Sequence, residues 1–436
     1  MKIRPARSLH GAIALPGDKS ISHRVAMIAA MANGDTTIDN FATSADCTST
    51  LSCLAALGVP LRRGENRVVV HGVGKRGFTA PAAPLDCGNS GTTMRLLAGI
   101  LAGQSFESTL TGDESLLARP MRRIIGPLGE MGAITTSNEG KPPLTITGQN
   151  PLRSIDYTLP VASAQVKSCV LLAGLNADGE TRVIEPTETR DHTERMLRWF
   201  GVNVRTRRTE NGRRVTVAGT ASLTARDVAV PADISSAAFF MAGAACLPGS
   251  DITMPGVGIN PSRRGVLDVL RDLGANIEVS GAAEQCGEPV ATLRIRGGLR
   301  KKQFLSPPIL RGDIIANLID EIPVLAVLGT QLSAGLVFRD AEELRFKETD
   351  RIAATAENLR RMGAEVTEFP DGLAVGPADL RGASIDSFGD HRIAMAFAMA
   401  GLLADGETEM TGADCADVSF PGFFEALELV RIERPA

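Results

Sequence analysis

Residues 19–34 read "KSISHRVAMIAAMANG", a segment that opens on polar residues, runs apolar for about three helical turns and closes on glycine. Segments of the same kind begin at Asn89, Ala162, Asp233, Asp320 and Asp390. Because Ser, Asp and Asn favour the first position of a helix, each segment predicts a mostly buried helix. Their recurrence indicates six repeated units of roughly seventy residues.

A second, amphipathic helix is predicted in each unit, as in "LRDLGA" (residues 270–275). In the first five units it ends at a glycine that we expect in the left-handed conformation, namely Gly58, Gly132, Gly201, Gly274 and Gly363. The sixth copy, near residues 423–430, lacks the glycine. Alternating runs at residues 66–72, 143–148, 213–219 and 291–297 predict strands with one solvent-exposed face.

Six α/β units in 436 residues predict two domains of three units each. The boundary is expected within residues 228–236, just before the fourth buried helix. In each domain, three buried helices related by pseudo-threefold symmetry would line an interior covered by sheet. The openings of these helices would then share one face.

Composition narrows the class of protein. The formal charge of −4 gives no general attraction to nucleic acid. The seven cysteines form neither a CxxC pair nor a Cys/His cluster, so we expect reduced thiols and no metal site. No signal peptide or run of eighteen apolar residues occurs, which predicts a soluble, cytoplasmic protein without membrane contact.

Charged and polar residues gather at the predicted helix openings. Helix amino-termini attract anions, so openings that converge would bind them. The alternative for any single Ser, Asp or Asn is an ordinary helix cap. Charges also cluster at residues 112–123, 185–196 and 343–354, where the alternative is a solvated helix face. In the last cluster, helical spacing predicts that Lys347 and Arg351 share a face, with Glu348 beside them.

The segment "LPGDKSISHR" (residues 15–24) resembles a nucleotide-binding P-loop only superficially. A P-loop requires glycine directly before the lysine, whereas Asp18 separates Gly17 from Lys19 here. A carboxylate at that position would repel a triphosphate. A P-loop NTPase is therefore not expected.

Eight motifs together carry a family resemblance: "LPGDKSISHR", "GNSGTTMRL", "GDESLLARPM", "LPVASAQVKS", "TRDHTE", "IDEIPVLAV", "LRFKETDRI" and "DHRIAMAF". In this order, over residues 16–424, the chain resembles the 5-enolpyruvylshikimate-3-phosphate synthases of the enolpyruvyl transferase family. "SAQVKS" and "TRDHTE" are similar to the bacterial class II group, and "GNSGTTMRL" to other branches. The resemblance implies two inside-out α/β barrel-like domains, each of three βαβαββ units. They would comprise residues 18–231, and residues 1–17 plus 232–436, with hinge crossings at 17–18 and 231–232.

The resemblance also implies an activity of the shikimate pathway, which leads to chorismate and the aromatic amino acids. The enolpyruvyl group of phosphoenolpyruvate would pass to the 5-hydroxyl of shikimate 3-phosphate by addition and elimination, with release of phosphate. Such a reaction needs acid/base groups and many cations, and implies no metal or organic cofactor. A monomer that is inhibited by glyphosate is expected.

Roles follow by matching positions to the family motifs. Asp320 would be the base on the 5-hydroxyl, Glu348 the proton donor to the methylene carbon, and Lys19 a bridge between the substrates that also helps proton transfer. Because these three groups would interact, the assignment of each proton stays open. Shikimate 3-phosphate would be bound by Lys19, Ser20, Arg24, Ser163, Ala164, Gln165, Arg190, Asp320 and Lys347. Phosphoenolpyruvate would be bound by Lys19, Asn89, Gly91, Arg119, Gln165, Arg351 and Arg392.

Three positions refine this assignment. Glycine at position 91 implies inhibition by glyphosate, and an alanine there would push a methyl group against the inhibitor. His391 is expected to position other groups and not to act as a base. Val418 stands where some members of the family carry a lysine that meets phosphoenolpyruvate, so one ligand differs.

Two alternatives remain in view. A UDP-N-acetylglucosamine enolpyruvyl transferase shares the fold and the chemistry, but typically has a cysteine in the loop that corresponds to "GDESLLARP", where this chain has none. A non-catalytic paralogue would have lost acid/base groups, whereas Lys19, Asp320 and Glu348 are all present.

Overall fold

The computed structural model describes residues 1–299 and 304–434, which fall into two compact units. Unit 2 consists of Gly17–Val230 and Gln285–Glu288, and unit 1 of the other described residues. The chain therefore changes unit after Pro16 and after Val230, and again on both sides of Gln285–Glu288. No pattern in the sequence predicts this short excursion.

Three buried helices form the interior of unit 2, namely α1 (Lys19–Met31), α3 (Gly91–Ala102) and α6 (Ala164–Gly174). Their caps are Asp18, Ser90 and Ser163, and each side chain accepts a bond from a backbone N–H of the first turn. At Gly99, a Cβ atom would lie 2.2 Å from the carbonyl oxygen of Cys169. Only glycine permits this approach of α3 to α6.

Three four-stranded sheets surround these helices. Their strand orders are β14-β3-β5-β4, β6-β7-β9-β8 and β10-β11-β13-β12. The strands are β3 (Asn33–Asp39), β4 (Leu61–Arg63), β5 (Arg67–Val73), β6 (Leu85–Asp86), β7 (Glu107–Thr111), β8 (Ile134–Asn138), β9 (Lys141–Thr147), β10 (Asp156–Thr158), β11 (Glu180–Glu185), β12 (Arg205–Thr209), β13 (Gly212–Ala218) and β14 (Val228–Ala229). In each sheet the first pair is parallel and the others antiparallel. The late strand β14 thus supplies the first position beside β3.

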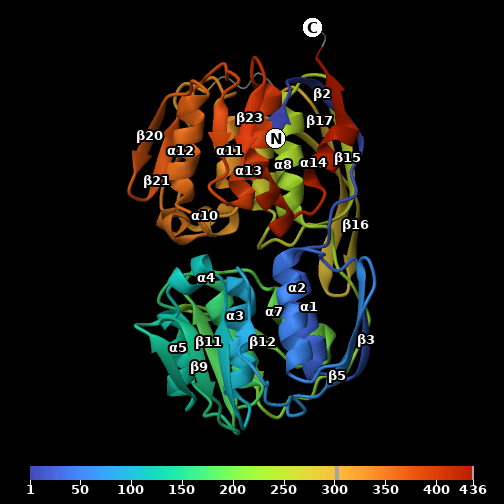
Figure 1. The fold of residues 1–436 in the computed structure, drawn as a ribbon, viewed down its shortest axis with the longest axis vertical. Coiled ribbons are helices and arrows are strands. Elements are labelled where there is room, and N and C mark those ends of the chain that lie inside the picture. Colours follow the sequence, from blue (N-terminus) through green and yellow to red (C-terminus); the bar gives the residue numbers. More distant parts are fainter. Residues whose placement is uncertain (300–303, 435–436) are drawn as a thin grey trace. The chain divides into compact units, whose positions relative to one another are not determined.

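Unit 1 repeats the plan around α8 (Ile234–Cys246), α11 (Ile322–Gly329) and α13 (His391–Leu403), which lie side by side in Figure 1. Its sheets are β16-β17-β15-β2-β24, β18-β19-β21-β20 and β1-β23-β22. The strands are β1 (Lys2–Ile3), β2 (Ala6–Ala12), β15 (Asp251–Gly258), β16 (Asn276–Gln285), β17 (Glu288–Arg296), β18 (Ile309–Leu310), β19 (Leu336–Phe338), β20 (Val366–Phe369), β21 (Gly372–Val375), β22 (Ser384–Asp386), β23 (Thr408–Thr411) and β24 (Arg431–Glu433). Here the amino-terminal strand β2 pairs in parallel with β15.

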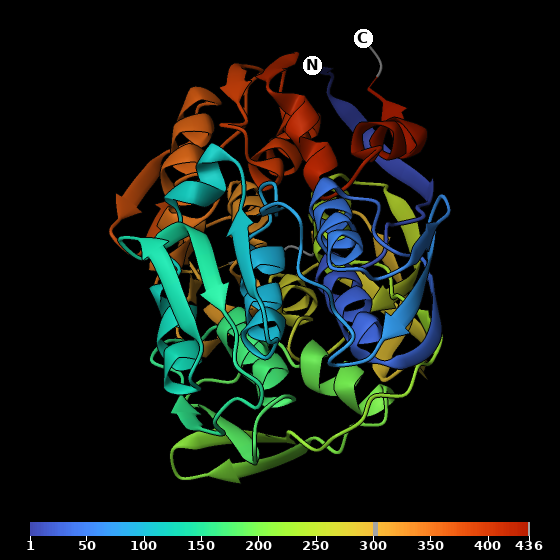
Figure 2. The ribbon, with the colours of Figure 1, turned by 60° about the horizontal axis from the view of Figure 1, so that its bottom comes forward.

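One amphipathic helix per repeat completes the pattern: α2 (Ala45–Ala56), α5 (Arg122–Glu130), α7 (His192–Trp199), α9 (Gly265–Asp272), α12 (Arg351–Arg361) and α14 (Phe423–Val430). The glycines that follow the first five all have positive φ, from 84° to 108°, as predicted. Figure 2 shows unit 2 from another side, with its strands outside its helices. The repeated α/β architecture and the four predicted strands are therefore confirmed.

Among the described residues, four short helical elements lie outside the predicted pattern, α4 (Glu114–Ala118), α10 (Asp313–Leu318), η1 (Glu342–Phe346) and η2 (Ala413–Val418). One of them overturns an expectation. Lys347 ends η1 in an extended conformation and α12 begins only at Arg351, so these two residues do not share a helix face. The cause is Asp350, whose side chain accepts from the Ala353 N–H at 3.0 Å and fixes the start of α12 there.

Among the described residues, no helix is long and apolar enough to cross a membrane. All seven cysteines are free thiols, and four of them are buried. The excursion Gln285–Glu288 is fastened within unit 2 by a hydrogen bond of 2.8 Å between His192 Nδ1 and Glu288 Oε1. Arg195 Nη1 also donates to the Gly287 carbonyl at 3.0 Å.

Candidate active site

Lys19 is the first residue of α1, and its ammonium forms an ion pair of 3.0 Å with Asp46 in the first turn of α2. Both side chains are mostly buried, with 16% and 10% of their surface exposed. Asp46 therefore sets the direction of the lysine. Sequence reasoning missed Asp46 because an acidic residue in a first turn is a common helix feature.

The predicted phosphoenolpyruvate ligands Asn89 and Arg119 lie together. Arg119 Nη2 donates to Asn89 Oδ1 at 2.6 Å and to Ser115 Oγ at 3.1 Å. Asn89 in turn donates to Asp113 Oδ2 at 2.8 Å. The loop that carries Arg119 is thus tied to the start of α3, where Gly91 lies.

Gly91 faces two guanidinium groups. A Cβ atom there would lie 2.7 Å from Arg95 Nη1 and 3.5 Å from Arg119 Nη1. Arg95 Nη1 also donates to Gln165 Oε1 at 2.7 Å, and Gln165 Nε2 donates to Thr92 Oγ1 at 2.9 Å. These bonds join the start of α3 to the start of α6, which carries Ser163 and Ala164.

Arg24, a predicted ligand of shikimate 3-phosphate, is deeply buried, with 3% of its surface exposed. Its guanidinium donates to Thr193 Oγ1 at 2.9 Å, to the Ser20 carbonyl at 2.8 Å and to Ser168 Oγ at 3.1 Å. Burial, and then the neighbouring charge of Arg190, lower the pKa of Arg24 to about 10. Arg24 therefore joins α1, α6 and α7, and half-buried Arg190 lies close enough to affect its charge.

In unit 1, Arg351 gathers three carboxylates. Its Nε lies 2.7 Å from Asp390 Oδ2, its Nη1 3.3 Å from Asp320 Oδ1, and its Nη2 2.5 Å from Glu348 Oε2. Burial by itself would lower the pKa of Arg351, but Asp390, Glu348 and Asp320 outweigh it and raise that pKa. The two predicted acid/base groups are therefore held on one permanently charged guanidinium.

Arg392 lies in the same group as the second residue of α13. Its backbone N–H donates to Asp390 Oδ1 at 2.8 Å, and its Nη1 donates to Ser235 Oγ at 2.6 Å and to the Asp320 carbonyl at 3.2 Å. Ser235 also bonds to buried Glu321, which pairs with Arg263 at 3.4 Å. Arg263 carried no repeat position or motif in the sequence, so sequence reasoning missed it.

Lys347 pairs with Glu343 at 2.9 Å, and His391 is buried with 2% exposed surface. The structure brings the predicted residues of unit 2 to its helix openings and its α7 loop. In unit 1 it brings Asp320, Glu348, Arg351 and Arg392 into one contacting group. Such a group can bind an anion on its arginines and exchange protons on its carboxylates.

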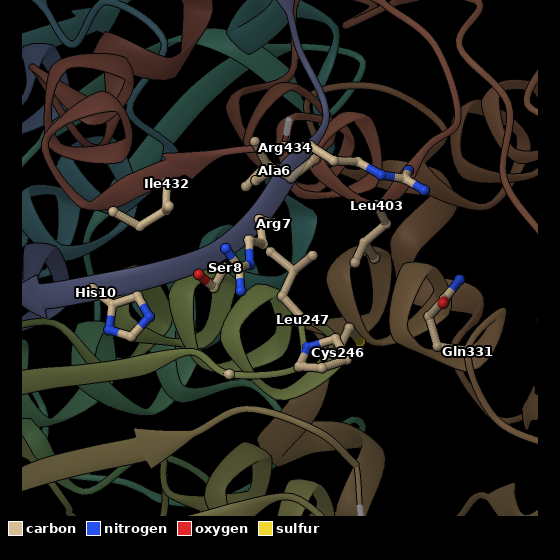
Figure 3. A pocket seen from close by; sticks show the side chains of 13 residues that line it. Ala6, Arg7, Ser8, His10, Cys246, Leu247, Gln331, Leu403, Ile432 and Arg434 are labelled. Carbon is tan, nitrogen blue, oxygen red and sulfur yellow. The ribbon is translucent and has the colours of Figure 1, made fainter. Parts of the chain in front are cut away.

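A cavity of about 890 Å³ in unit 1 lies elsewhere. Figure 3 shows Cys246 and Leu247 at the end of α8, Leu403 at the end of α13, and Arg7 of β2 lining it. Because α8 and α13 have 13 residues each, these ends lie about 20 Å from their openings. None of the predicted site residues lines this cavity.

Comparison with known proteins gives consistent matches. The model of the family described as EPSP synthase (3-phosphoshikimate 1-carboxyvinyltransferase) matches residues 3–427. A relative named 3-phosphoshikimate 1-carboxyvinyltransferase from Solibacter usitatus is 52% identical over 431 residues, covering 98% of this chain and 99% of its own. One of the same name from Citrifermentans bemidjiense is 48% identical over 429 residues, covering 98% of each chain.

Solved structures agree with these matches. An EPSP synthase from Acinetobacter baumannii has a TM-score of 0.87 and 42% identity, covering 99% of this chain and 98% of its own. The enolpyruvyl transferase NikO from Streptomyces tendae has a TM-score of 0.79 and 19% identity, covering 98% of this chain and 96% of its own. The second likeness shows the fold alone.

Proposed function

Because this chain belongs to the EPSP synthase (3-phosphoshikimate 1-carboxyvinyltransferase) family, we propose that it transfers the enolpyruvyl group of phosphoenolpyruvate to the 5-hydroxyl of shikimate 3-phosphate. This transfer is a step of the shikimate pathway and releases inorganic phosphate. One observation supports the assignment of Asp320 and Glu348 as the acid/base groups: both carboxylates form ion pairs with the guanidinium of Arg351.

Asp320 and Glu348 supply the proton transfers in this proposal. In the addition, the oxygen of the 5-hydroxyl bonds to the central carbon of phosphoenolpyruvate while Asp320 takes the hydroxyl proton. Glu348 protonates the methylene carbon in the same step. In the elimination both transfers reverse: Glu348 takes back a proton from the new methyl group, the carbon–carbon double bond forms again, and the bond from the central carbon to the phosphate oxygen breaks as the departing phosphate receives the proton held by Asp320. Each transfer contributes about 10²–10⁴-fold to the rate in enzymes of this kind.

The arginines of unit 1 supply charge. Asp390 accepts from the Arg351 guanidinium with one carboxylate oxygen and from the Arg392 backbone N–H with the other, and the Arg392 guanidinium is held by Ser235 and the Asp320 carbonyl. In the proposal both arginines bind the phosphoenolpyruvate anion. Preorganised donors of this kind stabilise charge that develops in a transition state without reorganising during the reaction.

Unit 2 supplies the remaining binding groups. Shikimate 3-phosphate is assigned to Ser20, Arg24, Ser163, Ala164, Gln165 and Arg190, with Lys347 from unit 1. Phosphoenolpyruvate is assigned to Asn89, Gly91 and Arg119, and Lys19 meets both substrates. The two substrates together carry about −5 to −6, which the arginines and lysines of this set offset.

A phosphate-release assay tests the function. The purified protein is incubated with phosphoenolpyruvate and shikimate 3-phosphate, and in parallel with phosphoenolpyruvate and UDP-N-acetylglucosamine. We expect release only with the first pair, at a rate that depends on both substrates. Release only with the UDP-sugar, or with neither acceptor, would contradict the proposal.

The proposal includes three finer statements: inhibition by glyphosate at the phosphoenolpyruvate site, a monomeric state, and action in the cytoplasm. Gly91 supports the first, because the absence of a Cβ atom there lets the guanidinium groups of Arg95 and Arg119 lie against this turn. Inhibition competitive with phosphoenolpyruvate tests the first statement, light scattering of the purified protein the second, and fractionation of the producing cells the third.

A further inference from the structure

A fully buried charge cluster lies beneath the helix openings of unit 2. Lys167 Nζ lies 2.9 Å from Glu185 Oε1 and 2.9 Å from Glu194 Oε1, and all three side chains are 0% exposed. Arg213 approaches the two carboxylates at 3.7 and 3.9 Å. Two positive and two negative groups therefore balance inside the unit, as burial of charge requires.

The cluster holds the loop that leads to Arg190. Glu185 Oε1 accepts from the Thr189 N–H at 3.1 Å and from Thr189 Oγ1 at 2.5 Å. Lys167 Nζ also donates to the Thr189 carbonyl at 3.4 Å. Both backbone groups of Thr189, which directly precedes Arg190, are therefore hydrogen-bonded to the buried ion pair: the N–H to Glu185 and the carbonyl to Lys167.

The residues adjacent to Lys167 on α6 and to Glu194 on α7 make a second set of contacts. Ser168 Oγ bonds to Thr193 Oγ1 at 2.7 Å, and Arg24 donates to both hydroxyls. The motifs "SAQVKS" and "TRDHTE" thus meet through Lys167 with Glu194 and through Ser168 with Thr193. Neither Lys167 nor Glu194 can touch a substrate in this structure, because both side chains are sealed from solvent.

We propose that Lys167 is a positioning residue for shikimate 3-phosphate. Through Glu185 it fixes the loop that presents Arg190, and through Glu194 it fixes the first turn of α7. The inference rests on the proposed function, because it takes Arg190 to be a ligand of that substrate. Phosphoenolpyruvate is assigned to other residues, so its binding does not depend on Lys167.

Lys167→Met tests the role by steady-state kinetics of phosphate release. We expect the KM for shikimate 3-phosphate to rise by about tenfold or more, with little change in the KM for phosphoenolpyruvate. Adding Glu194→Gln to this variant removes the surplus negative charge and leaves Glu185 to pair with Arg213. We expect the KM for shikimate 3-phosphate to return part of the way to the wild-type value. Hydrogen exchange at the Thr189 amide should be faster in Lys167→Met and slower again in the double variant.

Lys75→Met is the matched control. Lys75 also lies in unit 2, where its ammonium donates to the carbonyls of Leu175 and Gly219 at 2.7 Å each. We expect it to lower stability and leave both KM values unchanged. If Lys167→Met does not fold, the charge-balanced double variant is compared with Lys75→Met instead.

The outcomes separate the two proposals. A wild-type protein that releases no phosphate contradicts the proposed function itself. If the wild type is active, two results contradict the positioning role alone. In the first, folded Lys167→Met keeps the wild-type KM for shikimate 3-phosphate, and in the second, the KM values for both substrates rise equally. A rise in the control that matches the rise in Lys167→Met also overturns the role.

Discussion

Asp390 and Arg351 form an ion pair of 2.7 Å in which the two side chains are 0% and 2% exposed. The second oxygen of Asp390 accepts from the Arg392 N–H and caps α13. One carboxylate therefore fixes both arginines that are assigned to phosphoenolpyruvate. Its removal is expected to affect stability and substrate binding together.

Asp390→Asn keeps an oxygen for the helix cap and removes the charge that faces Arg351. Breaking a buried ion pair on one side costs about 3–5 kcal/mol, so we expect a loss of this size in the free energy of unfolding. The KM for phosphoenolpyruvate should rise as well. Urea denaturation and phosphate-release kinetics measure the two effects.

Asp386→Asn serves as the control for that change, because its carboxylate accepts from the Phe388 N–H and pairs with no arginine in the described ion pairs. It should cost no more than about 1.5 kcal/mol. An equal loss in both variants would show that the buried charge of Asp390 has no special weight.

Asp320→Asn and Glu348→Gln should each lower kcat by about 10²–10⁴-fold, since each removes one proton-transfer group. Binding of shikimate 3-phosphate to Glu348→Gln, followed by calorimetry, should be retained. Glu357→Gln, on an exposed face of α12 where the carboxylate pairs with Arg361, is the control and should leave kcat unchanged. Near-normal turnover in Glu348→Gln would remove this residue from the mechanism.

Gly91→Ala should weaken inhibition by glyphosate by about tenfold or more, a change of about 1.4 kcal/mol in binding. The structure adds a cause to the expectation from sequence. The new methyl group would meet Arg95 Nη1 at 2.7 Å and force it away from Gln165, so the KM for phosphoenolpyruvate should also rise, by a smaller factor.

Gly126→Ala is the matched control for this substitution, because a Cβ atom there meets nothing within 4 Å. Inhibition constants measured against phosphoenolpyruvate compare the two variants. Unchanged inhibition in Gly91→Ala would contradict the steric argument at this position.

His23 predicts a specific response to acid. Burial, and then the charges of Lys19 and Arg24, hold the pKa of His23 well below its usual value near 6.5. At a pH between the pKa of His23 in the native protein and its pKa in the unfolded chain, this residue is protonated only in the unfolded chain. Stability is therefore lost as the pH falls below about 6.5. From pH 7.5 to pH 5.5 this residue should account for about 1.4 kcal/mol.

His23→Gln should remove that part of the acid sensitivity, as measured by urea denaturation at the two pH values. The glutamine keeps a polar partner for Thr50 Oγ1, to which His23 Nδ1 bonds at 2.7 Å. His10→Gln, at an exposed position, is the control. The explanation fails if wild type and His23→Gln lose the same stability.

Local patterns in the sequence predicted the repeated helices, their caps and the glycines that end them, because capping and left-handed turns depend on residues a few positions apart. They also marked most of the charged residues of the site. The pairing of Arg351 with Asp320, Glu348 and Asp390 was not predictable, because these contacts join three separate segments. The prediction that Lys347 and Arg351 share a helix face was wrong because the Asp350 side chain caps α12 and so starts the helix after Lys347.

Glu288 is fastened to His192 in unit 2, although β16 and β17, which lead to and from it, are strands of unit 1. A nascent chain therefore cannot finish unit 2 when residue 230 leaves the ribosome. The partner of His192 emerges only with residue 288. The amino-terminal strands wait as well, because β2 pairs with β15 and β1 pairs with β23. Although domains commonly fold in the order of their synthesis, neither unit of this protein can be completed before synthesis has advanced well into the second half of the chain.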